Sequence, residues 1–152
     1  MSNVTAIHNA IAAQDITFTD GRIIEALTLD AAVNRVLSDS LPFRIIMPPG
    51  ATGGPGIQAY EPIAGKMAKV TWRVTDLMLY EAVGRGDLGE IWTSLTDYIG
   101  LYVQTFTASR RVANGTIIGF LPQAGVFQWP EGGTSYHGVL TTVLVEETVC
   151  GT

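Results

Sequence analysis

Apolar residues recur at helical spacing in one long stretch of the chain. The repeating positions are Leu88, Ile91, Trp92, Leu95, Tyr98, Ile99, Tyr102, Val103 and Phe106. This spacing places them on one face of a helix of about five turns. Asp87 can cap the first turn, and Glu90 three residues later completes a capping box. The pattern predicts an amphipathic helix over about 87–109 whose aromatic side chains lie in the core.

Alternation of apolar and polar residues predicts the strands. In the segment 67–80, Val70, Trp72 and Val74 share one face, and polar residues occupy the other. Alternation favours an antiparallel sheet, because parallel strands buried on both faces read as unbroken apolar runs. By the same criteria and by β-propensity, further strands are expected at 43–47, 116–121, 125–129 and 135–149.

The N-terminal third is less regular. Val4, Ile7, His8 and Ile11 predict a short helix over about 3–14. The apolar residues of 16–24 fit either two short strands or an irregular crossing, with a turn at Asp20-Gly21. A second short helix over 29–37 is an option before Pro42.

The element order indicates an α+β fold. We expect an antiparallel sheet of four to five strands, packed by the long helix and joined by the short N-terminal helix. Residues 1–152 form a single domain at this length. A long flexible loop is expected over about 48–66, because 48–56 hold seven Pro or Gly in nine positions.

Charge is scarce in this chain. Only 23 of 152 residues, or 15%, are charged, against about 25% in ordinary soluble domains. A monomer of this mass exposes roughly 7,500 Å², so either its surface is unusually neutral or other chains cover part of it. The formal net charge of −5 disfavours nucleic-acid binding as the main activity, although DNA passing through is compatible with it.

Targeting signals are also scarce. No apolar run approaches the roughly 20 residues of a membrane span. The N-terminus lacks the pattern of a secretory signal, and Cys150 is the single cysteine, which favours synthesis in a reducing cytosol.

Candidate catalytic groups are few. The two histidines and the cysteine, at 8, 137 and 150, lack metal-ligand spacing. Ser135 and His137 share a strand face, but no third group or nucleophile elbow accompanies them. We therefore predict no catalytic residues, no metal site, no cofactor and no enzymatic activity.

One glycine pattern matches a motif of nucleotide-binding proteins. Residues 84–89 read Gly-Arg-Gly-Asp-Leu-Gly, which satisfies the G-x-G-x-x-G pattern of dinucleotide sites. However, Asp87 would lie against the pyrophosphate, and no strand ends in an acid about 20 residues later. The pattern therefore favours a tight strand-to-helix turn, and a small ligand-binding α+β domain remains the weaker alternative.

Several residues are candidates for contact with other chains. Trp129 is expected to be an exposed aromatic at a hairpin tip, followed by Pro130-Glu131-Gly132-Gly133. The second face of the final strand is mixed, so it is expected to meet a neighbour rather than water. The contact candidates are Gly50, Thr52, Gly54, Gln58, Trp129, Glu131, Leu140 and Leu144.

The order of elements also resembles a known family. The segments concerned are Leu41-Pro42-Phe43-Arg44-Ile45-Ile46-Met47-Pro48, Thr71-Trp72-Arg73-Val74-Thr75-Asp76-Leu77, the long helix with Tyr98, the Asn114-Gly115-Thr116 turn, and the closing hairpin from Gly125 to Glu147. Over nearly its whole length the chain resembles bacteriophage tail terminator, or tail-completion (minor tail), proteins. Related tail and neck proteins share much of this pattern.

The resemblance implies a structural role in the virion. Copies would form a ring, commonly a hexamer, that caps the tail tube and joins it to the neck connector. The implied partners are other copies, the tail tube protein and the connector, with DNA only passing through a channel. The implied location is the virion tail, after synthesis in the cytoplasm of a host bacterium. A neck or head-completion adaptor is the alternative within the same class.

Overall fold

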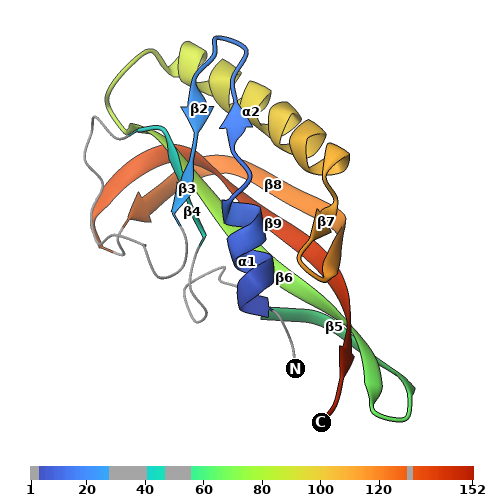
Figure 1. Cartoon of the computed structure of the whole chain (residues 1–152). Helices are drawn as coiled ribbons and strands as arrows, with labels where there is room; N and C mark the ends of the chain where they lie inside the picture. Colours follow the sequence, from blue (N-terminus) through green and yellow to red (C-terminus); the bar gives the residue numbers. More distant parts are fainter. Residues whose placement is uncertain (1–3, 28–40, 47–55, 130–131) are drawn as a thin grey trace.

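A computed structural model describes residues 4–27, 41–46, 56–129 and 132–152 (Figure 1). In chain order the elements are α1 (Val4–Ala12), β1 (Ile16–Thr17), β2 (Ile23–Ile24), β3 (Ala26–Leu27), β4 (Phe43–Ile46), β5 (Gly56–Ala64), β6 (Met67–Ala82), α2 (Leu88–Ala108), β7 (Arg111–Val112), β8 (Gly115–Trp129) and β9 (Thr134–Cys150). The expected helix at 29–37 lies outside the described residues.

One large sheet organises the fold. The strand β9 pairs antiparallel with β6 on one side and with β8 on the other, along most of its length. The far edge of β6 is shared by β5, which pairs with residues 67–73, and by β4, which pairs with 76–79. The strand β3 extends the sheet beyond β4, β7 pairs with the start of β8, and β1 and β2 form a separate ribbon.

The α+β class and the mainly antiparallel sheet are confirmed, but the expected four to five strands are too few. The sheet has seven strands within the described residues, and β3 pairs with β4 in parallel. Two of the additional strands, β3 and β7, have only two residues each. Such short strands carry no periodicity that a sequence pattern can reveal.

The helix α2 lies across one face of the sheet, here called the helix-side face (Figure 1). Both β6 and β8 are antiparallel to β9, so they run in the same direction with β9 between them, and α2 connects them. The buried side of α2 consists of Ile91, Leu95, Tyr98, Tyr102 and Phe106. These side chains pack against α1, β1, β2 and the sheet in one core cluster.

The predicted helix at 87–109 is confirmed, but one of its aromatic residues is not in the core. Trp92 is 42% exposed, whereas Tyr98 and Tyr102 are fully buried. Trp92 lies on the flank of the helix, outside the line of buried positions. The apolar stripe in the sequence is therefore wider than the stripe that the sheet covers.

The loop expected over 48–66 is wrong in its second half. Residues 56–64 form β5, and a turn with Gly65 at φ +56° connects it to β6. Residues 57–64 of β5 are all exposed, so the strand shows no alternation of buried and exposed positions. A strand without a buried face leaves no hydrophobic period in the sequence. Residues 48–55 lie outside the described residues.

The strand β8 is also longer than expected. It continues through the predicted break between 121 and 125, with a bulge at Ile118 between the pairs Ile117–Val145 and Gly119–Leu144. Pro122 lies within it, which is tolerated because edge strands need fewer hydrogen-bond donors.

The turn before β8 differs by one residue from the expected Asn114-Gly115 turn. Val112 pairs with Gly115, so the turn residues are Ala113, at φ +53°, and Asn114. Gly115 belongs to the strand, where a Cβ atom would overlap the side chain of Val145. Close packing against Val145 therefore explains why a glycine occupies this position.

Candidate functional site

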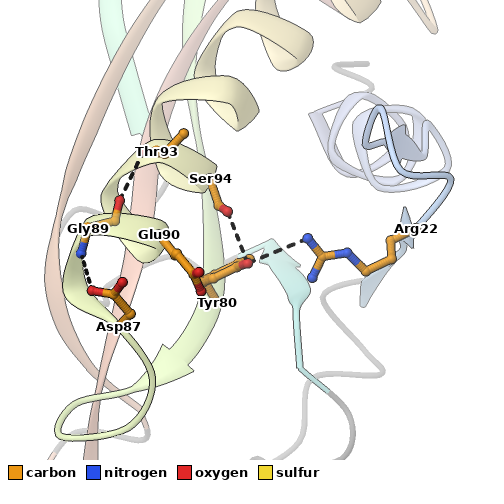
Figure 2. Close-up of a pocket in the computed structure, with 7 residues that line it drawn as sticks. All are labelled: Arg22, Tyr80, Asp87, Gly89, Glu90, Thr93 and Ser94. Atoms are coloured by element: carbon orange, nitrogen blue, oxygen red, sulfur yellow. Dashed lines mark hydrogen bonds between the residues drawn. The ribbon is translucent and has the colours of Figure 1, made fainter.

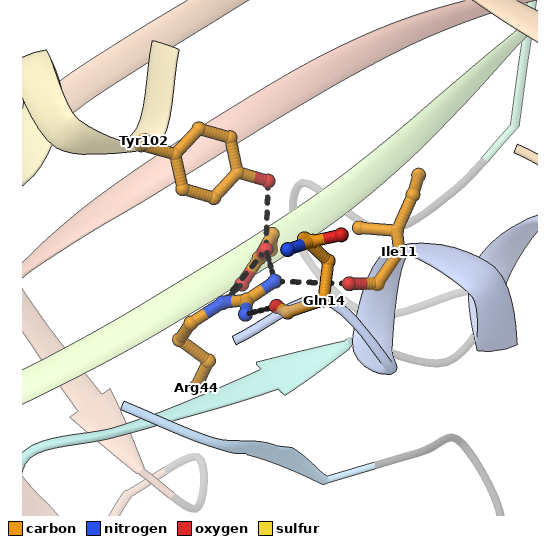
Figure 3. A network of polar contacts seen from close by, with 5 residues as sticks. Ile11, Gln14, Arg44 and Tyr102 are labelled. Carbon is orange, nitrogen blue, oxygen red and sulfur yellow. Dashed lines mark hydrogen bonds and ion pairs between the residues drawn. The ribbon is translucent and has the colours of Figure 1, made fainter. Parts of the chain in front are cut away.

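A buried ion pair joins the elements of the core (Figure 3). Arg44 of β4 and Asp76 of β6 are both fully buried, and Arg44 Nη2 lies 2.6 Å from Asp76 Oδ2. The Tyr102 hydroxyl of α2 donates a hydrogen bond of 2.7 Å to the same oxygen. A strand pair and the long helix are thus joined through one carboxylate.

The same guanidinium also holds the end of the N-terminal helix. Arg44 donates hydrogen bonds to the carbonyl oxygens of Gln14 and Ile11, the latter at 3.2 Å. Its Cζ atom lies 5.6 Å from the ring centre of Tyr102 and 5.9 Å from that of Phe106. Arg44 therefore links the C-terminal end of α1, and the residues that follow it, to the sheet.

Burial controls the protonation of this cluster. Burial lowers the pKa of Arg44, but Asp76, together with Tyr98 and Tyr102, more than offsets this effect, so the net pKa is raised. Burial, together with the charge of Asp76, raises the pKa of Tyr98 and Tyr102 well above the usual value. Arg44 therefore stays protonated, and the two tyrosine hydroxyls keep their protons. The cluster is closed to solvent, so it stabilises the fold and offers no surface to a substrate.

Neither Arg44 nor Asp76 is among the site residues expected from the sequence. A signal was present, because both residues occupy core-facing positions of predicted strands. Asp76 follows Val70, Trp72 and Val74 at period two, and Arg44 shares its face with Ile46. Two opposite charges on core faces predict a buried pair.

A polar groove of about 560 Å³ lies at the start of α2 (Figure 2). Its lining residues are Arg22, Tyr80, Asp87, Gly89, Glu90, Thr93 and Ser94. The Tyr80 hydroxyl lies 3.1 Å from Ser94 Oγ and accepts a hydrogen bond of 3.5 Å from Arg22. Arg22 also forms an ion pair of 2.9 Å with Asp20. Much of the polar lining is therefore already paired within the protein.

The glycine pattern at 84–89 forms the tight turn that the sequence predicts. Gly84 and Gly86 have φ of +91° and +74°, a region that favours glycine. Asp87 caps α2, and its Oδ1 accepts a hydrogen bond of 3.1 Å from Gly89 N–H. The capping-box bond from Asp87 N–H to Glu90 does not form. Asp87 occupies the position where a phosphate would need free N–H groups, so the arrangement disfavours a nucleotide.

Both histidines are buried. His8 is buried, and its Nδ1–H donates to the Val4 carbonyl oxygen at 2.7 Å. Burial lowers the pKa of His8, and the bond to Val4 partly offsets this effect. His137 Nδ1 has no hydrogen-bond partner among the described residues, so it does not bond Ser135.

Neither a metal site nor a membrane-spanning helix is found in the described part of the chain. Over the residues that the structure describes, no group of three or more His, Cys, Asp or Glu side chains is placed to hold a metal ion. Within the same residues, no helix has the length and apolar character needed to cross a membrane.

Exposed apolar side chains gather along two strands at opposite ends of the sheet. On the β5–β6 hairpin they are Ile57, Tyr60, Ile63 and Met67, with 55, 64, 54 and 43% exposure. On β8 they are Ile118, Leu121 and Val126, with 54, 61 and 54% exposure. Figure 1 shows the β5–β6 hairpin extending away from the helices. Apolar side chains left in water along strands are typical of protein contact surfaces.

Both strands also have an unpaired edge within the described part of the chain. The strand β5 pairs there only with β6, and β8 beyond Ile117 pairs only with β9. An unpaired edge presents free N–H and C=O groups that can pair with another strand. These two edges are the candidate assembly surfaces of the protein.

The predicted contact residues are only partly brought together. Gln58 is exposed on β5, and Leu140 and Leu144 are half-buried on the sheet face opposite α2. They therefore do not form one patch. Four of the candidates, Gly50, Thr52, Gly54 and Glu131, lie outside the described residues.

The expectation of an exposed Trp129 is wrong. Its side chain is half-buried and packs against the cluster of Ile45, Leu77, Leu79 and Tyr136. Leu140 packs against the same cluster. The strand pairing continues to Trp129, opposite Thr134, so the tryptophan stays over the sheet instead of standing at a free tip.

No protein-family model matches the chain, and no curated protein sequence matches it.

Proposed function

We propose that this protein is a structural subunit of a bacteriophage virion, and that its copies form a ring, hexameric by analogy, which caps the tail tube and joins it to the neck. The proposal starts from the sequence resemblance to tail terminator proteins. The observation that supports it further is that, within the described residues, two different strands on opposite sides of β6 and β9 have an edge without a partner strand, namely β5 and the part of β8 beyond Ile117.

Two unlike edges suit a closed ring. In a ring each copy uses one surface toward the copy before it and a different surface toward the copy after it. A two-fold dimer needs only one self-complementary surface. Two open edges on one subunit therefore favour head-to-tail association.

The scarcity of charge fits the same role. The chain exposes 8205 Å², so its 23 charged residues each serve about 360 Å². A contact of ordinary size covers about 800 Å² per partner, and two such contacts leave about 6,600 Å². The net charge of −5 is compatible with DNA passing through a channel without being held.

Electron microscopy of tail tubes tests the role. Purified protein is incubated with tubes of the cognate tail protein and, separately, with purified head connectors. We expect it to bind one end of the tubes and to leave the tube wall free. Binding to connectors alone would replace the tail terminator by the neck adaptor, and binding to neither would contradict the proposal.

A further inference from the structure

Both sides of the large sheet are stepped. On one side, residues 67–73 of β6 pair with β5, whereas 76–79 pair with β4, and β3 lies one strand further out (Figure 1). On the other side, β7 pairs with the start of β8, and 118–128 of β8 have no outer neighbour within the described residues. Each step is the width of one strand, about 4.8 Å.

The strand registers show that the two steps match. A row of paired residues crosses the sheet at the level of β5 and β7, where level means position along the strand direction: Ala59, Thr71, Glu146, Thr116 and Arg111. A second row crosses at the level of β3: Ala26, Arg44, Met78, Val139 and Ala124. Both rows are five strands wide. Where one side of the sheet extends outward by a strand, the other side is therefore set back by a strand.

One rotation can bring the ends of both rows together. Rotation about an axis parallel to the strands keeps every residue at its own level and keeps the helix-side faces aligned. Because each row is five strands wide, β5 of the next copy comes beside β7 at the same time as its β3 comes beside β8. From the observed pairings, β3 would run antiparallel to β8, and β5 would run parallel to β7.

The charges of these strands are complementary. Glu61 is the only charged residue of β5, and Arg111 is the only one of β7. Ala59 lies in the same row as Arg111, and Glu61 follows two residues later on the same face of β5, within reach of a long side chain. The other contact involves no charge, because 26–27 and 118–128 contain no charged residue. Edge strands that must stay unpaired usually carry charges.

We infer that a second copy of this chain occupies each side of the sheet, with β5 of one copy beside β7 of its neighbour and β3 of the same copy beside Gln123 and Ala124 of β8. The inference rests on the proposed ring, names the surfaces that close it and sets the ring axis parallel to the strands. The two sides match in step, level and charge, which an unrelated partner would not require.

Paired cysteines at the ends of the two rows test both contacts, in a Cys150→Ser background. The variant Ala59→Cys with Arg111→Cys tests β5 against β7. The variant Ala26→Cys with Ala124→Cys tests β3 against β8. Adjacent strands place Cα atoms within the range that a disulfide needs.

The control is Ala59→Cys with Ala124→Cys, which places the two cysteines on opposite sides of the sheet but at different levels. Folding of each protein is checked by circular dichroism. The proteins are then oxidised by dioxygen with copper phenanthroline as catalyst. Denaturing electrophoresis without a reductant gives the number of chains that are joined.

We expect each matched variant to give a ladder of cross-linked chains that ends at one defined size, because the ring closes. The control should remain as single chains. An equimolar mixture of Ala59→Cys and Arg111→Cys proteins should give pairs and nothing larger, because each chain then carries one cysteine. If Arg111→Cys disturbs folding, the Ala26→Cys with Ala124→Cys variant still tests the fit, because it leaves β7 unchanged.

Three results would overturn the inference. They are a folded matched variant that stays as single chains, a control that gives the ladder, and cross-linked pairs from Ala59→Cys alone, which indicate contact between two β5 strands. Binding to tail tubes without cross-links in the matched variants would refute the edge pairing and leave the proposed function intact. Cross-linked ladders of a protein that binds neither tubes nor connectors would refute the proposed function and leave the pairing intact.

Discussion

The helix-side face of the sheet and the strands at its two edges contain similar apolar residues but have different surroundings. On the face, Val139, Val143 and Met78 are fully buried beneath the helices. At the edges, Ile57 and Leu121 keep more than half of their surface in water. The face is complete within one chain, whereas the edges lack a partner within the described residues. We therefore expect the stability of the fold to depend on the face, and we propose that association depends on the edges.

The polar groups show the same contrast. In the core, Asp76 accepts hydrogen bonds from Arg44 and Tyr102. At the edges, backbone donors and acceptors are left for another strand or for water. Substitutions in the core should therefore change the free energy of unfolding, and substitutions at the edges should change the mass of the assembly in solution.

The largest expected effect is from breaking the buried ion pair. Asp76→Ala leaves the Arg44 charge buried without its partner, so it should lower the free energy of unfolding by about 3–5 kcal/mol. Urea denaturation followed by circular dichroism measures this loss. The double variant Arg44→Met with Asp76→Leu should recover much of it, because no charge then remains buried. A loss below about 1 kcal/mol for Asp76→Ala would show that water reaches the pair.

A smaller loss is expected at Gly138 of β9, which lies against the backbone of β6. A Cβ atom at Gly138 would overlap the carbonyl oxygen of Met78. Gly138→Ala should therefore cost about 1–3 kcal/mol through backbone displacement. Gly132→Ala serves as the comparison. No atom lies near the Cβ position of Gly132, but its φ is +77°, so this change tests backbone strain in a turn without crowding in the sheet. An unchanged melting temperature for Gly138→Ala would place the strands further apart than described.

The two buried tyrosines should respond differently to loss of the hydroxyl. Tyr102→Phe removes a hydrogen bond to the Asp76 carboxylate, which should cost about 1.5–3 kcal/mol. The Tyr98 hydroxyl is buried without a hydrogen-bond partner among the described residues, so Tyr98→Phe should be neutral or stabilising. Denaturation curves of both variants give the comparison. Equal losses would mean that both hydroxyls are bonded.

Alkaline pH should destabilise the core through the same tyrosines. Their pKa values are raised in the folded protein, so the unfolded chain loses its protons first, near pH 10. Stability from this source is complete below about pH 10 and falls above it by up to about 1.4 kcal/mol per pH unit for each tyrosine. The variant Tyr98→Phe with Tyr102→Phe should show a flatter curve. The same slope in both proteins would show that groups other than these tyrosines cause the loss of stability at alkaline pH.

The smallest effect on folding is expected at the edge. Ile63→Ser on β5 replaces a side chain that is 54% exposed, so the free energy of unfolding should change by less than about 0.5 kcal/mol. Thermal denaturation of dilute protein measures this change. A loss comparable with that of Tyr102→Phe would show that the arm is part of the core.

The sequence predicted the regions that have a buried face. The helix at 87–109 and the long strands ending near 80 and 149 repeat apolar residues with a clear period, because one side of each packs against the core. It also predicted the cap at Asp87, which depends on local hydrogen bonding. The interpretation of 84–89 as a turn followed from the chemistry of Asp87 at a helix start.

Other features left no local signal. The strand β5 has no buried side, so its residues were read as a loop. Trp129 was expected to be exposed because a following Pro-Glu-Gly-Gly sequence indicates a turn, yet its side chain packs against a cluster of buried residues from β4, β6 and β9. The pairing of Arg44 with Asp76 likewise depends on which strands become neighbours. The open edges could be recognised only once the strand order was known.

The most direct test of this account is the mass of the unmodified protein in solution, measured by native mass spectrometry over a range of concentrations. We predict a closed oligomer of one defined size, a whole multiple of 16.3 kDa. A monomer at the highest soluble concentration would contradict the claim that the β5 and β8 edges are contact surfaces between copies.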